Sequence, residues 1–317
     1  MRQARPLGGK LRLVETGLSI DLADIRSRAR AAFLGVALGD ALGATVEFMT
    51  PGEIRAERGV HREIVGGGWL RLKPGRVTDD TEMSLCIAQA LDAAGGWSLR
   101  GIADNFAKWM KSNPTDVGNT VRHGIRGWMV HGRIETPPNA WDAGNGAAMR
   151  MLPVALFTLG DDALLARCAV DQGHITHNHP FSDAGCIALG RMVHHALLRA
   201  PLASLRAQAD ALVAQHPNFA FEPYRGNATG YIVDTLQTVF HHFFATRSFE
   251  ECLVAVVNQG HDSDTTGAIA GMIAGAFYGR DALPGRWLQK LDPALVGALE
   301  RHADRLVALS PLGRAGV

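Results

Sequence analysis

The sequence predicts an all-α protein, because apolar residues recur at three- and four-residue intervals through most of the 317-residue chain and alternating β-branched runs are scarce. The joins between these periodic blocks are short polar or glycine- and proline-containing segments, so no domain boundary is indicated. We expect a flexible N-terminal extension over residues 1–22 and one compact helical domain over residues 23–317. Helices are expected over 24–44, 80–93, 100–111, 119–130, 146–159, 162–172, 182–199, 202–215, 228–244, 249–258, 265–277 and 294–309.

The composition is that of a globular protein, with 47% hydrophobic and 20% charged residues and a formal net charge of +1. This balance gives no general attraction to nucleic acid, so no nucleic-acid partner is expected. No apolar stretch reaches the ~20 residues of a membrane span, and no signal peptide is expected. The isolated cysteines are interpreted as buried reduced thiols, which favours a cytoplasmic location; they are Cys86, Cys168, Cys186 and Cys252.

The first and the penultimate helical blocks each carry a stripe of three glycines spaced four residues apart. Glycine costs a helix about 1 kcal/mol per site relative to alanine, so such a stripe indicates that another backbone approaches closely. We therefore expect these two helices to cross each other. The glycines are Gly35, Gly39 and Gly43 in one block and Gly267, Gly271 and Gly275 in the other.

Two clusters of carboxylates and hydroxyls stand at the starts of helical blocks, one over residues 77–82 and one over residues 261–266. Carboxylates are favoured there by the free amide groups and the helix dipole, but a cap needs only one such side chain. Oxygen ligands without nearby thiolates suit Mg²⁺ or Mn²⁺, and four carboxylates could neutralise two such ions. The clusters predict a dinuclear metal site. The alternative is two capped helices that never meet.

Two further segments are candidates for a ligand site. Residues 141–150 include Gly144-Asn145-Gly146 before a helical block, and small residues at a helix start let backbone amides approach a phosphate. An ordinary glycine-rich loop is the alternative. In the turn over residues 113–120, Asp116 is either a helix cap or, close to a metal site, a general acid or base.

These segments together with residues 39–48 resemble the ADP-ribosylglycohydrolase family. The resemblance runs from about Ala29 to Gly279, and its most specific parts are the Thr-Asp-Asp motif at 78–80 and the Asp-x-Asp-Thr motif at 262–265. The Gly-Gly-Gly-Trp-Leu stretch at 66–70 and the Asn-Pro-x-Asp-Val-Gly stretch at 113–118 resemble the branch that acts on ADP-ribosylated nitrogenase reductase.

The resemblance implies a compact helical fold with two Mn²⁺ or Mg²⁺ ions, and it assigns roles to particular residues. The implied metal ligands are Thr78, Asp79, Asp80, Asp262, Asp264 and Thr265. The implied catalytic residues are Asp116, beside the scissile bond, and Glu47, near the metals. The implied lining of the ADP-ribose cleft comprises Asn119, Gly144, Asn145, Gly146, His177 and Tyr231.

By the same resemblance the protein is expected to be a metal-dependent hydrolase that cleaves the N-glycosidic bond of ADP-ribosylarginine on a protein, with nitrogenase reductase as the substrate. A PII-type regulatory protein and regulated peripheral association with a membrane are expected as well. Two alternatives stay open. One is a hydrolase of another ADP-ribosylated acceptor, such as serine, a nucleic-acid base or a small guanidine; the other is a non-catalytic ADP-ribose sensor, which retention of all six ligands and Asp116 disfavours.

Overall fold

The computed structural model describes residues 21–140 and 143–316, and every regular element within them is a helix. The predicted all-α class is therefore confirmed. Residues 1–20 of the expected extension lie outside the described residues. The elements in chain order are α1 (Leu22–Gly43), α2 (Pro51–Arg58), α3 (Asp79–Ala94), α4 (Leu99–Lys111), α5 (Asn119–His131), α6 (Leu152–Phe157), α7 (Asp162–His174), α8 (Pro180–Leu197), α9 (Leu202–Gln215), η1 (Pro217–Phe219), α10 (Ile232–Ala245), α11 (Phe249–Val257), α12 (Ser263–Tyr278), η2 (Arg280–Ala282), α13 (Gly285–Leu288), α14 (Pro293–Leu309) and α15 (Pro311–Arg314).

The helix expected over 146–159 is wrong in its start, because α6 begins only at Leu152. The residues immediately before Leu152 form turns. Asn145 N–H donates to the Gly230 carbonyl at 3.0 Å, which ties this segment to the loop before α10. The same pairing holds that loop extended, so α10 begins at Ile232 rather than at residue 228. The glycine-rich segment therefore does not open a helix.

The sequence analysis missed α2, which has a single buried residue, Ile54, and so carries no helical periodicity. Its start is nevertheless encoded locally. The Thr50 hydroxyl accepts from Glu53 N–H at 3.3 Å, and the Glu53 carboxylate accepts from Thr50 N–H at 2.7 Å. This reciprocal pair is a capping box, and a proline at the first helical position supports it.

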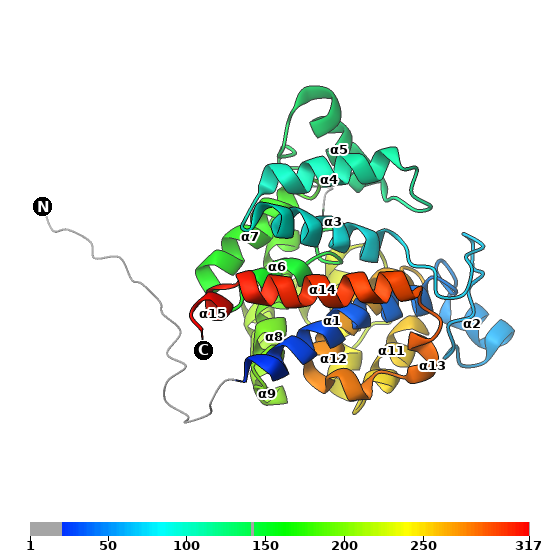
Figure 1. Ribbon diagram of the computed structural model, residues 1–317. Coiled ribbons are helices and arrows are strands. Elements are labelled where there is room, and N and C mark those ends of the chain that lie inside the picture. Colours follow the sequence, from blue (N-terminus) through cyan, green and yellow to red (C-terminus); the bar gives the residue numbers. More distant parts are fainter. Residues whose placement is uncertain (1–20, 141–142, 317) are drawn as a thin grey trace, which may run out of the picture.

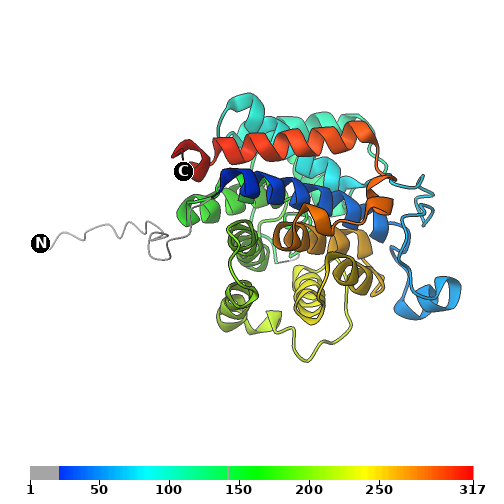
Figure 2. The ribbon, with the colours of Figure 1, turned by 60° about the horizontal axis from the view of Figure 1, so that its bottom comes forward.

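Helices α1 and α12 form the centre of the molecule. Every residue of α12 from Ser263 to Ala276 is buried, as only a central helix can be. Helix α14 packs on α1, while α8, α10 and α11 pack on α12. Figure 2 shows α1 lying between α14 and the group formed by α8 to α12. Helices α4 and α5 project at one edge, above α3 (Figure 1).

The glycine stripes are the reason α1 and α12 lie so close together, and the predicted crossing is confirmed. A Cβ atom on Gly35 would come within 2.1 Å of the Gly271 carbonyl oxygen, and one on Gly39 within 2.0 Å of the Gly267 carbonyl oxygen. Gly35 faces Gly271, and Gly39, further along α1, faces Gly267, which comes earlier in α12. The two helices are therefore antiparallel. The last turn of α1 therefore meets the first turn of α12, where Ser263 Oγ donates to the Gly43 carbonyl at 2.9 Å.

The four cysteines are free and buried, as expected, and burial raises the pKa of each thiol to about 12. Among the described residues, no helix is both long and apolar enough to cross a bilayer.

Candidate active site

A cavity of about 450 Å³ opens where the α1–α12 pair meets the first turns of α3 and α5. This volume lies in the ordinary range for small-ligand sites. Most of the residues that line the cavity lie in loops or in the first turns of α3, α5 and α12. The first amide groups of a helix have no partner within the helix, so they are available to a ligand in the cavity. Its lining residues are Glu47, Phe48, Asp79, Asp116, Gly118, Asn119, Thr120, Val121, Gly144, Asn145, Gly146, Met149, His177, Thr229, Gly230, His261, Asp262, Asp264 and Thr265.

Three carboxylates converge on this cavity from two parts of the chain. One carboxylate oxygen each from Glu47, Asp262 and Asp264 lie within 4.8 Å of one another. The Trp69 indole N–H donates to Glu47 Oε2 at 2.6 Å, and Asn145 Nδ2 donates to Asp262 Oδ2 at 2.7 Å. Glu47 and Asp262 are thus oriented by partners from outside the cluster.

A second set of oxygens, from Asp40, Thr78 and Asp80, is buried next to these three carboxylates. The Thr78 hydroxyl is 3.0 Å from Asp40 Oδ1, 3.1 Å from Asp80 Oδ2 and 3.4 Å from Asp264 Oδ2. One hydroxyl has a single proton to donate, so it can satisfy only one of these carboxylates. Asp80 Oδ1 is buried with no hydrogen-bond partner at all.

Burial and mutual repulsion raise the pKa values of these acids. Desolvation, with the charges of Asp116, Asp40 and Asp262, raises the pKa of Asp79 to about 8. Desolvation raises the pKa of Glu47 to about 8, although the Trp69 hydrogen bond opposes it. The pKa values of Asp80 and Asp264 are raised well above the usual range by burial and by neighbouring carboxylates.

The donor set fits a hard divalent cation. It consists of carboxylates and hydroxyls, it contains an unpartnered buried oxygen, and its acids repel one another. A cation would relieve both the repulsion and the missing hydrogen bond. Of the six expected ligands, Asp79, Asp262, Asp264 and Thr265 line the cavity, while Thr78 and Asp80 lie beneath it. The two acidic helix starts therefore meet, and the alternative of two separate capped helices is wrong.

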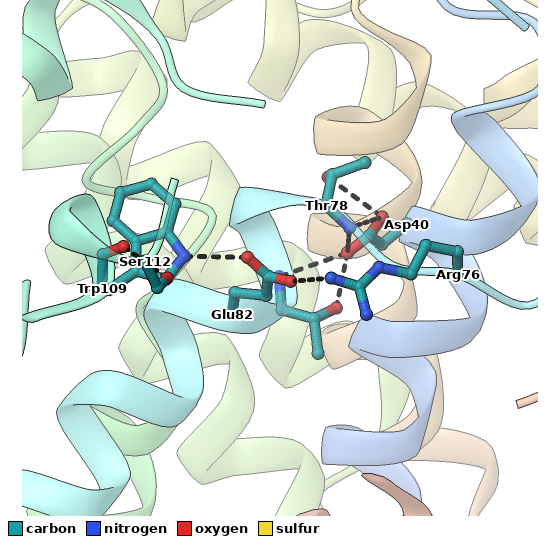
Figure 3. A network of polar contacts seen from close by, with 7 residues as sticks. Asp40, Arg76, Thr78, Glu82, Trp109 and Ser112 are labelled. Carbon is teal, nitrogen blue, oxygen red and sulfur yellow. Dashed lines mark hydrogen bonds and ion pairs between the residues drawn. The ribbon is translucent and has the colours of Figure 1, made fainter. Parts of the chain in front are cut away.

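Asp40 is a site residue that the sequence analysis missed. It is fully buried in the last turn of α1 and accepts hydrogen bonds from the backbone and the hydroxyl groups of both Thr78 and Thr81. Figure 3 shows these contacts beside the Glu82 carboxylate, which turns away to Arg76 and Trp109. The signal for it in the sequence was a single charge within the apolar run from Ala31 to Gly43 of α1.

Asp116 lies at the mouth of the cavity and does not cap a helix. The cap of α5 is Gly118, with no side-chain hydrogen bond. Burial raises the pKa of Asp116, while the Val117 amide and the charge of Arg122 oppose that shift. A half-buried carboxyl with a raised pKa is suited to hold and release a proton.

His177 forms the cavity wall opposite the glycine-rich segment. Its Nε2 would lie 3.0 Å from a Cβ atom on Gly144 and 3.1 Å from one on Gly146. The two glycines are needed because the imidazole ring occupies the space of their side chains. No helix begins at these glycines, so the expected helix start is wrong. Gly144, Asn145 and Gly146 do line the cavity, and their contact with a phosphate stays a prediction.

A buried arginine acts on the tautomer of His177. Arg150 Nη2 donates to Thr176 Oγ1 at 2.7 Å, and Thr176 Oγ1 lies 2.7 Å from His177 Nδ1. A hydroxyl that accepts from a guanidinium keeps its own proton free to donate, which favours a hydrogen bond from Thr176 to Nδ1. Burial and Arg150 also lower the pKa of His177 to about 3. The arrangement therefore favours the neutral ring with its proton on Nε2, on the side of Gly144 and Gly146.

The remaining expected cleft residues differ in position. Asn119, the first residue of α5, lines the cavity. Tyr231 does not: its side chain is 38% exposed, and its backbone pairs with that of Gly144 instead. Trp69 was not singled out as a site residue, although it belongs to the Gly-Gly-Gly-Trp-Leu stretch and holds Glu47.

An all-helical fold that gathers hard oxygen ligands beside a ligand-sized cavity has the features of a metal-dependent enzyme. The ADP-ribosylglycohydrolase family model matches residues 21–315, and the chain belongs to that family.

Known relatives resemble the chain over most of its length. It is 55% identical over 288 residues to ADP-ribosyl-(dinitrogen reductase) glycohydrolase of Rhodospirillum rubrum, covering 91% of this chain and 98% of the relative. It is 30% identical to ADP-ribosylarginine hydrolase Tri1 of Pseudomonas putida, covering 88% and 76%. A solved structure described as an ADP-ribosylglycohydrolase-related protein complex superposes with a TM-score of 0.81 at 32% identity, covering 91% and 99%.

Proposed function

We propose that this protein removes ADP-ribose from an arginine side chain of a protein, and that nitrogenase reductase is its substrate. The observation that carries the proposal is the meeting of Glu47, Asp262 and Asp264 beside Asp116 in one cavity. The similarity to the Rhodospirillum rubrum enzyme over nearly its whole length supports the choice of substrate. The reaction breaks the bond between C1 of the distal ribose and a guanidinium nitrogen.

The metal site is proposed to hold two divalent cations, Mn²⁺ or Mg²⁺. Thr78, Asp79, Asp80, Asp262, Asp264 and Thr265 would hold them, with Glu47 close by. Cations bound there would polarise ribose hydroxyls and a water molecule.

Asp116 is proposed to move the proton. When the bond breaks, its electrons go to the guanidine nitrogen, which takes a proton from Asp116, and a water oxygen adds to C1 and returns a proton to Asp116. Its raised pKa favours the protonated form that the first step needs. His177, with its proton on Nε2, donates to an oxygen of the bound ADP-ribose, and Asn145 holds Asp262 in orientation.

A PII-type regulatory partner, regulated association with a membrane surface and a cytoplasmic location remain predictions from the family resemblance.

The test compares free ADP-ribose released from arginine-modified nitrogenase reductase and from a serine-modified protein, with Mn²⁺ and after exhaustive chelation. We expect release from the arginine-modified protein with Mn²⁺ only. Comparison of kcat/KM on the two proteins measures discrimination in the transition state. A tenfold preference for serine would assign the chain to another acceptor, and binding of ADP-ribose without release from either protein would make it a sensor.

A further inference from the structure

A second cavity, of about 440 Å³, lies beside the candidate active site. It is formed by the loop that carries Trp69, the end of α4, and the exposed side of α5. Its lining residues are Trp69, Met110, Asn113, Pro114, Thr115, Asp116, Val117, Arg122, Arg126 and Met129. Of these lining residues, Asp116 alone has a role in the reaction proposed above.

The two cavities are joined at two points. Asp116 lines both of them. Trp69 lines the second cavity, while its indole N–H donates to Glu47 of the first at 2.6 Å. A substrate whose scissile bond lies at Asp116 therefore has ADP-ribose on one side and room for its acceptor on the other.

The rim of the second cavity is apolar and exposed, yet it is held in place. Trp69 is 53% exposed and Met129 is 40% exposed. The Trp69 ring packs on Phe48, with 5.2 Å between ring centroids. The loop that presents Trp69 is closed by reciprocal backbone hydrogen bonds of 2.8 and 2.9 Å between Gly67 and Leu72. An exposed aromatic side chain fixed in this way loses little conformational entropy when a partner covers it.

The backbone of the loop that carries Trp69 requires glycine at two positions, Gly66 and Gly68. Gly66 and Gly68 both have positive φ, and a Cβ atom on them would lie 2.5 Å from the Leu72 carbonyl oxygen and 2.4 Å from the Ala44 carbonyl oxygen. The Gly-Gly-Gly-Trp stretch therefore serves to seat one aromatic side chain against the body of the protein.

Two arginines of α5 line the side of the second cavity away from Trp69, and their positive charge indicates that a bound polypeptide carries an acidic group. Arg122 and Arg126 are exposed, one turn apart on α5, and no described carboxylate forms an ion pair with either of them. Like charges at this spacing repel mildly in a helix, and the Asp116 carboxylate already acts on the charge of Arg122. An acidic side chain on the incoming polypeptide would offset the charge that remains, chiefly that of Arg126.

We propose that the second cavity, with Trp69, Met129, Arg122 and Arg126, is the docking site for the polypeptide that flanks the ADP-ribosylated arginine, and that it recognises an acidic side chain there. This inference rests on the proposed function. The site distinguishes a modified protein from free ADP-ribosylarginine, because only the protein substrate carries flanking residues that can contact Arg126 and Met129.

The test uses Arg126 rather than Arg122, since the charge of Arg122 also lowers the pKa of Asp116 and its loss would alter the active site itself. Arg126→Ala removes the charge, and Arg126→Glu reverses it. The matched control is Arg26→Glu, an exposed arginine about 21 Å along α1 from Asp40, since a helix rises 1.5 Å per residue. Both substrates are assayed with each variant: ADP-ribosylated nitrogenase reductase and free ADP-ribosylarginine.

We expect Arg126→Glu to reduce kcat/KM on the modified protein by roughly tenfold at low salt, Arg126→Ala to reduce it less, and both effects to shrink as salt is added. Hydrolysis of free ADP-ribosylarginine should be unchanged in both variants, and Arg26→Glu should match the wild type. An equal loss on both substrates would mean that ADP-ribose itself occupies the second cavity, and no loss on either would mean that the protein docks elsewhere. If the wild type released no ADP-ribose from the modified protein, the proposed function itself would fail.

Discussion

Asp40 and Thr81 are joined by a hydrogen bond of 2.6 Å from the Thr81 hydroxyl to Asp40 Oδ2. Asp40 lies in the last turn of α1, and Thr81 lies in the first turn of α3. Thr78 N–H adds contacts of 3.0 and 3.1 Å to the same carboxylate. The first acidic cluster is therefore anchored to the central helix through a side chain that does not line the cavity (Figure 3).

Asp40→Asn should destabilise the protein and weaken metal binding together. The amide keeps the shape of the side chain but turns one oxygen acceptor into a donor that faces other donors. We expect the free energy of unfolding to fall by about 3 kcal/mol. Urea unfolding and Mn²⁺ titration measure the two effects. The control is Asp304→Asn, which removes a partly exposed ion pair with Arg30 and should cost about 1 kcal/mol. Equal effects of the two substitutions would contradict the anchoring role.

Much of the fold could be predicted because its signals are local. Helical periodicity identified most helices, and the glycine stripes identified which two helices cross. The crossing brings the start of α12 to the end of α1, whereas the start of α3 is held there through Asp40. The oxygen cluster itself was predicted from the ligand chemistry of the two acidic helix starts and from the family resemblance. Asp40 could not be predicted, because its role depends on hydrogen bonds across 41 residues of sequence. The start of α6 was wrong for a similar reason, since the pairing of Gly144 with Tyr231, far apart in the sequence, holds the segment before α6 out of a helix. The role of Tyr231 in the cleft stays a prediction.

The metal site predicts that Asp262→Ala abolishes Mn²⁺-dependent hydrolysis while leaving the helical content intact. Removal of one anion leaves bound cations under-neutralised, so we expect a loss of roughly 100-fold or more. Asn145→Ala should cost less, roughly 10- to 100-fold, because it only orients Asp262. Activity, metal content and circular dichroism check the series, with Asp281→Ala, an exposed residue of η2, as the control. Full activity of Asp262→Ala, or of chelated wild type, would exclude this site.

Asp116→Asn should separate turnover from binding. The amide cannot shuttle a proton, so turnover should fall by roughly 100-fold or more, while ADP-ribose still binds. Single-turnover kinetics and calorimetry with ADP-ribose measure the two properties. Normal turnover in this variant would exclude proton transfer by Asp116, and a parallel loss of binding would assign it to ligand contact instead.

The contact between Thr176 and His177 predicts a single tautomer of the ring. In wild type, ¹⁵N NMR should find the proton of His177 on Nε2, because Nδ1 accepts from the Thr176 hydroxyl at 2.7 Å. Thr176→Val removes that donor with little change of shape. It should produce a mixture of tautomers and weaken ADP-ribose binding by about tenfold. Thr176→Ser keeps the hydroxyl and should restore both. An unchanged tautomer in Thr176→Val would show that Arg150 and Thr176 do not position the proton.

His194 should make the protein less stable in acid. Burial lowers the pKa of its ring to about 4, from 6.5 in the unfolded chain, while Nε2 donates to the Ala155 carbonyl at 2.8 Å. Between these two values the unfolded chain takes up a proton that the folded protein does not, so stability is lost as the pH falls from 6.5 towards 4. His194→Gln keeps an N–H donor but does not titrate. Relative to its stability at pH 7.5, the variant should lose about 2 kcal/mol less than wild type by pH 5. Urea unfolding at both pH values measures this, and equal losses in the two proteins would mean that His194 takes up a proton as readily in the folded protein as in the unfolded chain.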